Sequence, residues 1–201
     1  MAIDFKKTTF EGYVPEIWRG ECKMLPGGFK PLQSFETGTV LHRGTPVYVD
    51  FSNMTAAVCK TAKVIAGGTT QNPRVTKGSL FAVGDKVTKN GDGASTPSVK
   101  SIDTSNTEYD VLGLSAAYTG LTEGDVIVES GDKPSDGSAS AKYTPNMIVG
   151  ANKAFDGKGI PTLDVAYEAV VLTASLSAPI LEDWLNGCCL KSNPNILFIK
   201  Q

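Results

Sequence analysis

Any catalysis in this chain would depend on very few side chains, because the sequence contains one histidine, His42. Nucleophilic catalysis by a Ser/His/Asp or Cys/His arrangement needs an imidazole base, so it would have to use His42. This residue stands in TVLHRGTP, between an expected strand and a turn, and no GxSxG motif accompanies it. The sequence therefore favours a solvent-facing turn histidine over a hydrolase, and we expect no enzyme activity.

Two pairs of neighbouring carboxylates could act as the acid and base of a glycosidase: Glu108 with Asp110, and Glu182 with Asp183. That reaction needs two carboxylates that face each other across a bond, and nearness in sequence does not provide this geometry. Glu182 and Asp183 are better explained by the start of a helix, where the helix dipole favours negative charge. We therefore expect no catalytic residue in either pair.

The stretch DTSNTEYD, residues 103–110, carries oxygen ligands at alternating positions and superficially matches a calcium loop. It lacks the glycine in the middle of the loop, and Glu108 stands too early for the bidentate ligand of the twelfth position. A type I turn or an Asx turn between two strands is favoured over a calcium site. We expect no metal and no cofactor.

The stretch VTKGSLFAVGDKVTKNG, residues 75–91, has the composition of a phosphate loop but not the order GxxxxGK[ST]. The dipeptide Gly84-Asp85 recurs as Gly124-Asp125, and each precedes an apolar run. Glycine permits positive φ, and aspartate can accept a hydrogen bond from a backbone N–H two residues further on, so both copies are expected to be turns. The apolar residues Val75, Leu80, Val83 and Val87 are expected in the core, and Phe81 either in the core or at an interface. The lysines Lys77, Lys86 and Lys89 are expected to be solvated. Asn90-Gly91 is expected to close a hairpin.

Composition limits the classes of function. The 201 residues include 19 basic and 21 acidic side chains, so the net charge of −2 gives no general attraction to nucleic acid or to an anionic membrane. No apolar run approaches the ~18 residues that cross a bilayer, and the amino terminus lacks the apolar core of a signal peptide. The cysteines Cys22, Cys59, Cys188 and Cys189 form no CxxC pair and are expected to be unpaired thiols.

Residues 1–35 are expected to form an extended N-terminal arm, because prolines and aromatic residues alternate there with neither strand nor helix periodicity. The apolar load of this segment must be buried if it is ordered, either on its own domain or on a partner. Both alternatives stay open at this point. The candidate interface residues are Tyr13, Ile17, Trp18, Leu25 and Phe29.

Residues 36–201 are expected to form one β-rich domain, a sandwich or a barrel-like body, because short β-type runs follow one another at intervals of about 8–15 residues. One such run is AAVCKTAKVI, and NILFIK reads as a buried last strand. Two turn-rich inserts, residues 90–97 and 130–142, are expected to be exposed loops. SAPILEDWLNG predicts a short C-terminal helix at about 177–187, with Ser177 as cap, Gly187 as stop and an apolar face that docks on the sheet.

Several of these segments, taken in order, resemble the head fibre proteins of tailed bacteriophages, a family akin to capsid decoration proteins. They are VTKGSLFAVGDKVT, SIDTSNTEYDVLGL, GDVIVES, KYTPNMIVG, SAPILEDWLN and NPNILFIK, within Thr37 to Lys200. The chain departs from the family pattern at Ser79, where the family often has histidine, and in the long insert at residues 131–140.

The resemblance implies a non-enzymatic virion protein that decorates or stabilises the outside of a phage head. It would be assembled in the bacterial cytoplasm, often as a homotrimer, and its partners would be the major capsid protein or other head proteins. The alternative is an adhesion module that binds carbohydrate or a host cell surface, with Tyr109, Tyr118 and Tyr143 stacking on sugars.

Overall fold

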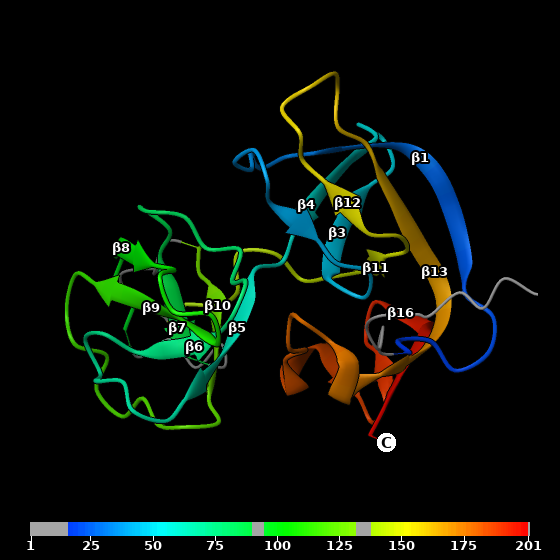
Figure 1. Ribbon diagram of the computed structural model, residues 1–201. Helices are drawn as coiled ribbons and strands as arrows, with labels where there is room; N and C mark the ends of the chain where they lie inside the picture. Colours follow the sequence, from blue (N-terminus) through cyan, green and yellow to red (C-terminus); the bar gives the residue numbers. More distant parts are fainter. Residues whose placement is uncertain (1–15, 90–94, 132–137, 201) are drawn as a thin grey trace, which may run out of the picture.

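The structure is a computed structural model that describes residues 16–89, 95–131 and 138–200. Strands dominate these ranges, and the helical elements in them are two short 3-10 turns, η1 (Thr173–Ser175) and η2 (Glu182–Trp184). The expected fold class, mainly β with a barrel-like body, is confirmed. The strands divide between two bodies that lie side by side (Figure 1).

The larger body contains a closed ring of five strands, which we call the first barrel. The sheet order β1-β4-β3-β11-β13 closes because β1 also pairs antiparallel with β13. Side chains two residues apart point to the same face of a strand, and Val47 with Val49 and Leu163 with Val165 fill the inside in this way. The strands are β1 (Lys23–Pro31), β3 (Pro46–Asp50), β4 (Thr55–Val58), β11 (Met147–Val149) and β13 (Leu163–Leu172).

The smaller body is a six-stranded sheet in the order β7-β10-β5-β6-β9-β8, which we call the second barrel. A bridge between Lys86 and Ser98, continued by backbone hydrogen bonds between residues 84–87 and 97–99, joins the two ends of the sheet. Its core includes Val75, Leu112 and Ile127. The strands are β5 (Thr61–Ile65), β6 (Arg74–Thr76), β7 (Val87–Lys89), β8 (Val99–Asp103), β9 (Tyr109–Leu114) and β10 (Val126–Glu129).

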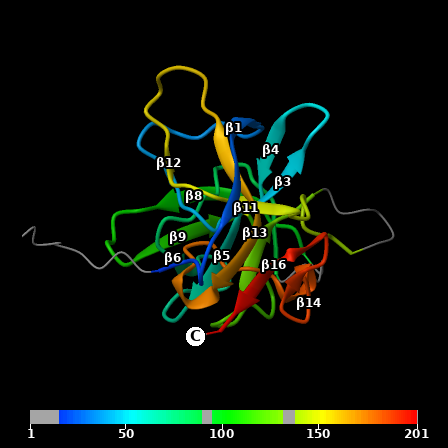
Figure 2. The ribbon, with the colours of Figure 1, turned by 90° about the vertical axis from the view of Figure 1, so that its right-hand side faces the viewer.

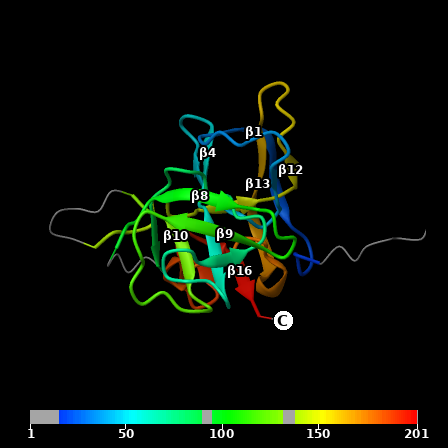
Figure 3. The same cartoon turned by 60° about the vertical axis from the view of Figure 1, so that its left-hand side comes forward.

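The second barrel is an insertion within the chain of the first, since β4 precedes it and β11 follows it. The run AAVCKTAKVI is therefore two strands: β4 ends at Val58 in the first barrel and β5 begins at Thr61 in the second. The apolar pattern continues through the crossover, so the sequence does not reveal it. The single β-rich domain expected over residues 36–201 thus has two barrels, and Figure 3 brings the second one forward.

The C-terminal part extends the first barrel. β16 (Asn193–Ile199) pairs parallel with the end of β13, and the hairpin of β14 (Leu185–Asn186) and β15 (Cys189–Leu190) follows it. The expected last strand is present, with Ile196 and Phe198 buried. A separate pair, β2 (Val40–Leu41) with β12 (Lys153–Ala154), lies beside the first barrel (Figure 1).

The helix expected over residues 177–187 is wrong. Only η2 is helical there, and the chain enters β14 directly after it. Short isolated helices are marginal in water, whereas this segment gains strand pairing with β15 and burial of Leu181 and Trp184. Gly187, at φ 61°, makes the hairpin turn rather than a helix stop. The apolar face was correctly predicted to pack on the sheet, but without a helix.

The two barrels share a third apolar cluster between them. It combines Ile148 and Ala166 from the first barrel, Val128 from β10 of the second, and side chains of the C-terminal extension such as Trp184 and Phe198. Because one continuous cluster touches both barrels, their relative position is fixed by packing as well as by the two chain crossovers.

Candidate functional site

The described part of the expected arm lies on its own chain. β1 is a full member of the first barrel, Ile17 and Phe29 are buried, and Trp18 forms a bridge with Val171. Leu25 is half-buried against the core of the first barrel, and Tyr13 lies outside the described residues. Ile17 and Phe29 are therefore core residues in this structure, and of the candidate interface set Trp18 and Leu25 keep partial exposure.

Exposed apolar side chains gather instead at one end of the first barrel. Phe51 and Met54 stand on the β3–β4 turn, Leu32 follows β1, and Ile160 stands in the loop between β12 and β13; we call these four residues the apolar loop end. Their exposed fractions run from 46% for Met54 to 78% for Ile160. Figure 2 shows these three loops at the top of the molecule, far from the C-terminus. The sequence pattern did not reveal this surface, because an exposed apolar residue in a loop leaves no periodic signal.

The β3–β4 turn that presents Phe51 and Met54 is well braced. Asp50 accepts hydrogen bonds from the backbone N–H of Ser52 at 2.8 Å and from the side-chain amide of Asn53 at 2.7 Å. The Asn53 side chain is the main reason why the pKa of Asp50 lies below its usual value. Phe51 also packs edge-on against Phe29, with ring centroids 5.8 Å apart. Local hydrogen bonds and ring packing therefore stabilise the turn in a conformation that leaves its apolar side chains partly exposed to solvent.

Met54 has a positive φ of 52°, which a residue with a side chain adopts at an energetic cost. Among the non-glycine residues that the structure describes, this is the one positive φ. Backbone strain of this kind collects at functional turns. It singles out the β3–β4 turn as the part of the apolar loop end with a special conformation.

The residues weighed as catalytic are not assembled into a site. His42 is exposed, and its carbonyl oxygen accepts hydrogen bonds from the backbone N–H and the hydroxyl of Thr45, so it is the predicted turn histidine. Glu182 and Asp183 are exposed on η2. Within the described ranges no group of three or more His, Cys, Asp or Glu side chains could hold a metal ion.

The Asp103–Asp110 loop contains the predicted Asx turns. Asp103 Oδ1 accepts the N–H of Ser105 at 2.9 Å, and Asn106 Oδ1 accepts the N–H of Glu108 at 2.8 Å. The carbonyl oxygens of the loop face Lys77, whose Nζ donates to those of Thr104 and Asn106, each at 2.8 Å. A lysine thus occupies the oxygen-rich side of this loop.

Asp110, at the end of the same loop, is buried, and both of its carboxylate oxygens accept hydrogen bonds. It accepts hydrogen bonds from Lys77 Nζ at 2.8 Å and from the N–H groups of Gly78 and Ser79 at 2.9 and 3.1 Å. The expectation that Lys77 is simply solvated is wrong, because its ammonium joins the residues 77–79 turn to β9. Lys89 likewise pairs with Asp125 at 2.9 Å.

The two Gly-Asp turns are confirmed, with one change in their hydrogen bonds. Gly84 and Gly124 have φ of 99° and 91°. Each aspartate accepts the N–H three residues before it rather than two residues after it: Asp85 from Ala82, and Asp125 from Thr122, both at 2.7 Å. Val83, expected in the core, lies at the tip of the first turn and is 67% exposed. The Asn90-Gly91 turn lies outside the described residues.

The three tyrosines proposed for sugar stacking have different surroundings. Tyr118 is buried, and its hydroxyl accepts the N–H of Lys89 at 2.9 Å, so it is a core residue. Tyr109 is half-buried beneath the guanidinium of Arg74, 4.5 Å from the ring centroid. Tyr143 stacks on Tyr48, with centroids 6.4 Å apart, and Tyr48 is 42% exposed.

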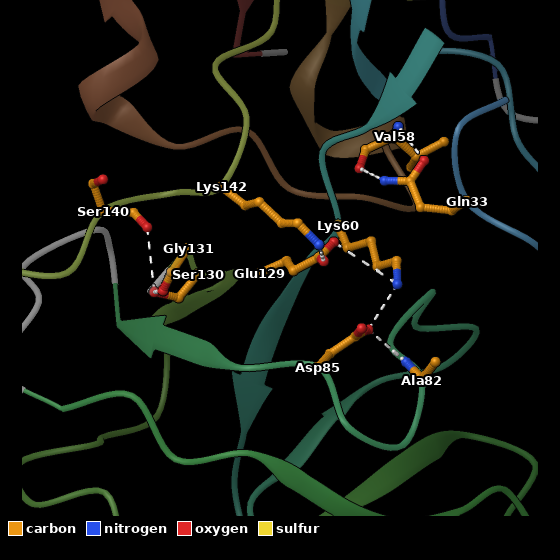
Figure 4. A network of polar contacts seen from close by, with 10 residues as sticks. All are labelled: Gln33, Val58, Lys60, Ala82, Asp85, Glu129, Ser130, Gly131, Ser140 and Lys142. Carbon is orange, nitrogen blue, oxygen red and sulfur yellow. Dashed lines mark hydrogen bonds and ion pairs between the residues drawn. The ribbon is translucent and has the colours of Figure 1, made fainter. Parts of the chain in front are cut away.

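Four charged residues meet where the chain crosses between the barrels, and we call them the buried charge cluster: Lys60, Asp85, Glu129 and Lys142 (Figure 4). Lys60 Nζ lies 2.7 Å from Asp85 Oδ2 and 3.8 Å from Glu129 Oε2. Lys142 Nζ lies 2.6 Å from Glu129 Oε1. The side chains of Lys60 and Glu129 are only 6% and 4% exposed, whereas the side chain of Lys142 is 44% exposed and forms the edge of the cluster. Sequence reasoning missed this cluster, because Lys60 sits inside an apolar run whose break at the crossover was not visible.

The four cysteines are unpaired thiols, as predicted. Cys59 is buried, and burial strongly raises the pKa of its thiol. Cys188 is exposed at the turn of the β14–β15 hairpin, on the rim of a groove of about 710 Å³ between the C-terminal extension and β10. Apolar residues such as Val126, Leu185 and Phe198 line this groove.

Among the residues that the structure describes, no helix is long and apolar enough to cross a membrane. Comparison of the chain with models of protein families, with curated proteins and with solved structures found no match. The function must therefore be inferred from the fold, the exposed apolar side chains and the buried charged residues of this chain.

Proposed function

We propose that the protein is a non-enzymatic structural component of a phage virion, a head fibre or auxiliary capsid protein on the outside of the head. The observation that carries this proposal is the apolar loop end, in which Phe51 and Met54 stand on a braced turn and Ile160 is exposed on the β12–β13 loop. Exposed apolar side chains that gather at one end of a protein are typical of surfaces that bind other proteins. The resemblance to head fibre proteins supplies the partner.

In this proposal the apolar loop end contacts the major capsid protein or another head protein. The head displays many copies of the same partner surface, so neighbouring weak contacts add through multivalency. The protein is assembled in the bacterial cytoplasm and is located on the capsid exterior. We also propose a homotrimer, as the resemblance implies. A mass measurement at micromolar concentration tests it, and a monomer alone would contradict it.

Binding to purified heads tests the proposed surface. The double substitution Leu32→Asp with Ile160→Asp places charge on two separate loops of the apolar loop end, at side chains that are 54% and 78% exposed, so folding should be retained. We expect at least about tenfold weaker binding, because a few apolar anchors carry most of the energy of an interface. The matched control is Val83→Asp, which changes an exposed valine of the second barrel.

Three results would contradict the proposal. The first is absence of the protein from purified virions by mass spectrometry, and the second is failure of the unaltered protein to bind intact heads. The third is an equal loss of head binding in the Val83→Asp control, which would contradict the assignment of the apolar loop end as the surface that binds the head.

A carbohydrate-binding module is the second candidate, and one observation favours it. The ring of Tyr48 is partly exposed and lies nearly parallel to the ring of Tyr143, at an interplanar angle of 14°, so the two rings offer a flat aromatic surface. Tyr48→Ala should abolish binding on a glycan array if this function holds. Silence of the unaltered protein on such an array at high concentration would exclude it.

A further inference from the structure

The buried charge cluster has the arrangement of groups that can join a lysine to an aspartate covalently. Lys60 Nζ touches the Asp85 carboxylate at 2.7 Å, and Glu129 Oε2 lies 3.8 Å from the same nitrogen. All three side chains are largely removed from water, with exposed fractions of 6% for Lys60, 16% for Asp85 and 4% for Glu129. A nucleophile, an electrophilic carbonyl carbon and a proton carrier therefore meet in one dry site.

We propose that Lys60 and Asp85 form an intramolecular isopeptide bond, with Glu129 as the catalytic residue that carries the protons. The proposal concerns this chain alone and does not depend on the virion function.

The reaction balances without any co-reactant. Glu129 takes a proton from the Lys60 ammonium, and the nitrogen lone pair then attacks Cγ of Asp85. A C–N bond forms, one C–O bond of Asp85 breaks, and the oxygen leaves as water. The two protons that complete this water both come from the ammonium, carried by Glu129, which ends as the carboxylate it was at the start. No group is oxidised or reduced.

The two oxygens of Glu129 are placed for this role. Lys142 Nζ holds Oε1 at 2.6 Å and so fixes the side chain. Oε2 is buried and has no hydrogen-bond partner, and it faces Lys60. A buried polar atom without a hydrogen bond is costly, and such atoms mark sites where chemistry or an additional group is involved. The unsatisfied Oε2 is the observation that distinguishes this cluster from an ordinary buried ion pair.

Asp85 is also held in position from the other side. Its Oδ2 accepts the N–H of Ala82 at 2.7 Å within the Gly84 turn. This hydrogen bond stabilises negative charge on the oxygen as the nitrogen attacks the carbon. The backbone around Asp85 is paired with residue Val99 in both directions, through Gly84 N and Asp85 O, which anchors the turn in the second barrel.

The bond would tie the crossover between the barrels to the Gly84 turn. Lys60 is the last residue before β5, and Asp85 is 25 residues further along the chain. A covalent link across this span reduces the conformational freedom of the unfolded chain, as a disulfide does, but it does not respond to reducing agents. The link would also fix the Gly84 turn, beside which the Lys86–Ser98 bridge and the neighbouring backbone hydrogen bonds close the second barrel.

Mass spectrometry of the intact folded protein tests the proposal. We expect the mass to be lower than the sequence mass by one water molecule. Trypsin should not cleave after Lys60, and the digest should contain residues 44–63 joined to residues 78–86. A full sequence mass together with normal cleavage after Lys60 would overturn the proposal.

Matched variants identify the groups. Lys60→Arg keeps the positive charge but lacks the amine nucleophile, so the loss of water should disappear while circular dichroism still reports a folded protein. A loss of water that persists in this variant would come from another reaction, such as succinimide formation at an Asp-Gly pair, and would overturn the proposal. Asp85→Ala should likewise abolish the linked peptide.

Glu129→Gln tests the proton carrier separately from the fold. Positioned acid–base groups contribute roughly 10²–10⁴-fold, so the link should form at least about a hundred times more slowly in this variant. The readout is the fraction of linked peptide against time after refolding from denaturant. An unchanged rate in a folded Glu129→Gln protein would remove Glu129 from the mechanism and overturn the proposal in this form.

Discussion

The two barrels consist of similar short strands, but they differ in how they are closed and in what they expose. The first barrel is closed by pairing of β1 with β13 at Lys23–Leu25 and again at Phe29, whereas the second is closed by the single Lys86–Ser98 bridge and nearby backbone hydrogen bonds. Among the described residues, the exposed large apolar side chains belong to the first barrel and its flanking segments, apart from Val83.

Charged pairs show the opposite distribution. Within the described ranges, the ion pair of the first barrel is Lys23 with Glu168, and it is exposed, whereas Asp110, Asp125 and Glu129 are paired in or beside the second. The second barrel, which has short strands and a weak closure, is thus reinforced by side-chain to backbone hydrogen bonds and by ion pairs. The first barrel instead exposes apolar side chains on its loops.

Core truncation should have the largest effect and should show whether the barrels unfold together. Leu163→Ala in the first barrel and Leu112→Ala in the second, both fully buried, should each lower the free energy of unfolding by about 2–5 kcal/mol. Since the shared cluster joins the barrels, we expect a single urea transition in both variants. Two separate transitions would contradict this, and the exposed Leu32→Ala is the control.

Loss of the Asp110 carboxylate should be the next largest effect. Asp110→Ala leaves the backbone N–H groups of Gly78 and Ser79 without their acceptor, removes the ion pair with Lys77, and should cost roughly 2–3 kcal/mol. Glu168→Ala, which breaks the exposed pair of the first barrel, should have no measurable effect. If chemical denaturation gives equal losses of stability for the two variants, the two barrels do not differ in how much they depend on their charged pairs.

Substitution in the recurring turns should have a moderate effect. Gly84→Ala introduces a side chain at positive φ and should cost about 1–2 kcal/mol, although its Cβ would meet no neighbouring atom. Gly131→Ala is the matched control, because its φ lies outside the left-handed region and its Cβ also has space. A thermal unfolding scan in which both variants behave alike would contradict the role of φ.

Acid should weaken the second barrel through Asp125. Burial raises the pKa of this carboxyl, but hydrogen bonds from Lys89 and Thr122 outweigh burial, so the pKa is lower than usual. A lowered folded-state pKa means that the contribution to stability is complete above about pH 5 and is lost as the pH falls through the folded pKa. Asp125→Asn should therefore be less stable than the parent at pH 7, with a difference that shrinks in acid. A constant difference would contradict the pairing.

The smallest expected effect is a difference in thiol reactivity between Cys188 and Cys59, without any change in stability. Cys188 is exposed and should react with a thiol reagent in the folded protein. Cys59 should stay unlabelled until unfolding, because burial strongly raises the pKa of its thiol. Labelling of Cys59 at the rate of Cys188 would indicate that the crossover between the barrels opens easily.

Local patterns determined a large part of this structure. Short β-type runs separated by turns predicted the β class, Gly84 and Gly124 predicted their turns, and the stretch of residues 103–110 predicted a type I or Asx turn. These features depend on residues close in sequence, whose φ preferences and hydrogen bonds are set locally.

Only the tertiary structure decided the rest. It divided AAVCKTAKVI between two barrels, replaced the expected helix by a hairpin, drew β1 into the first barrel, and exposed Val83 while burying Tyr118. Each outcome depends on pairing between distant segments, such as β1 with β13, and on burial that no local window contains. For the same reason the sequence could not show that Lys60, Asp85 and Glu129 meet, because their contact exists only once both crossovers between the barrels are in place.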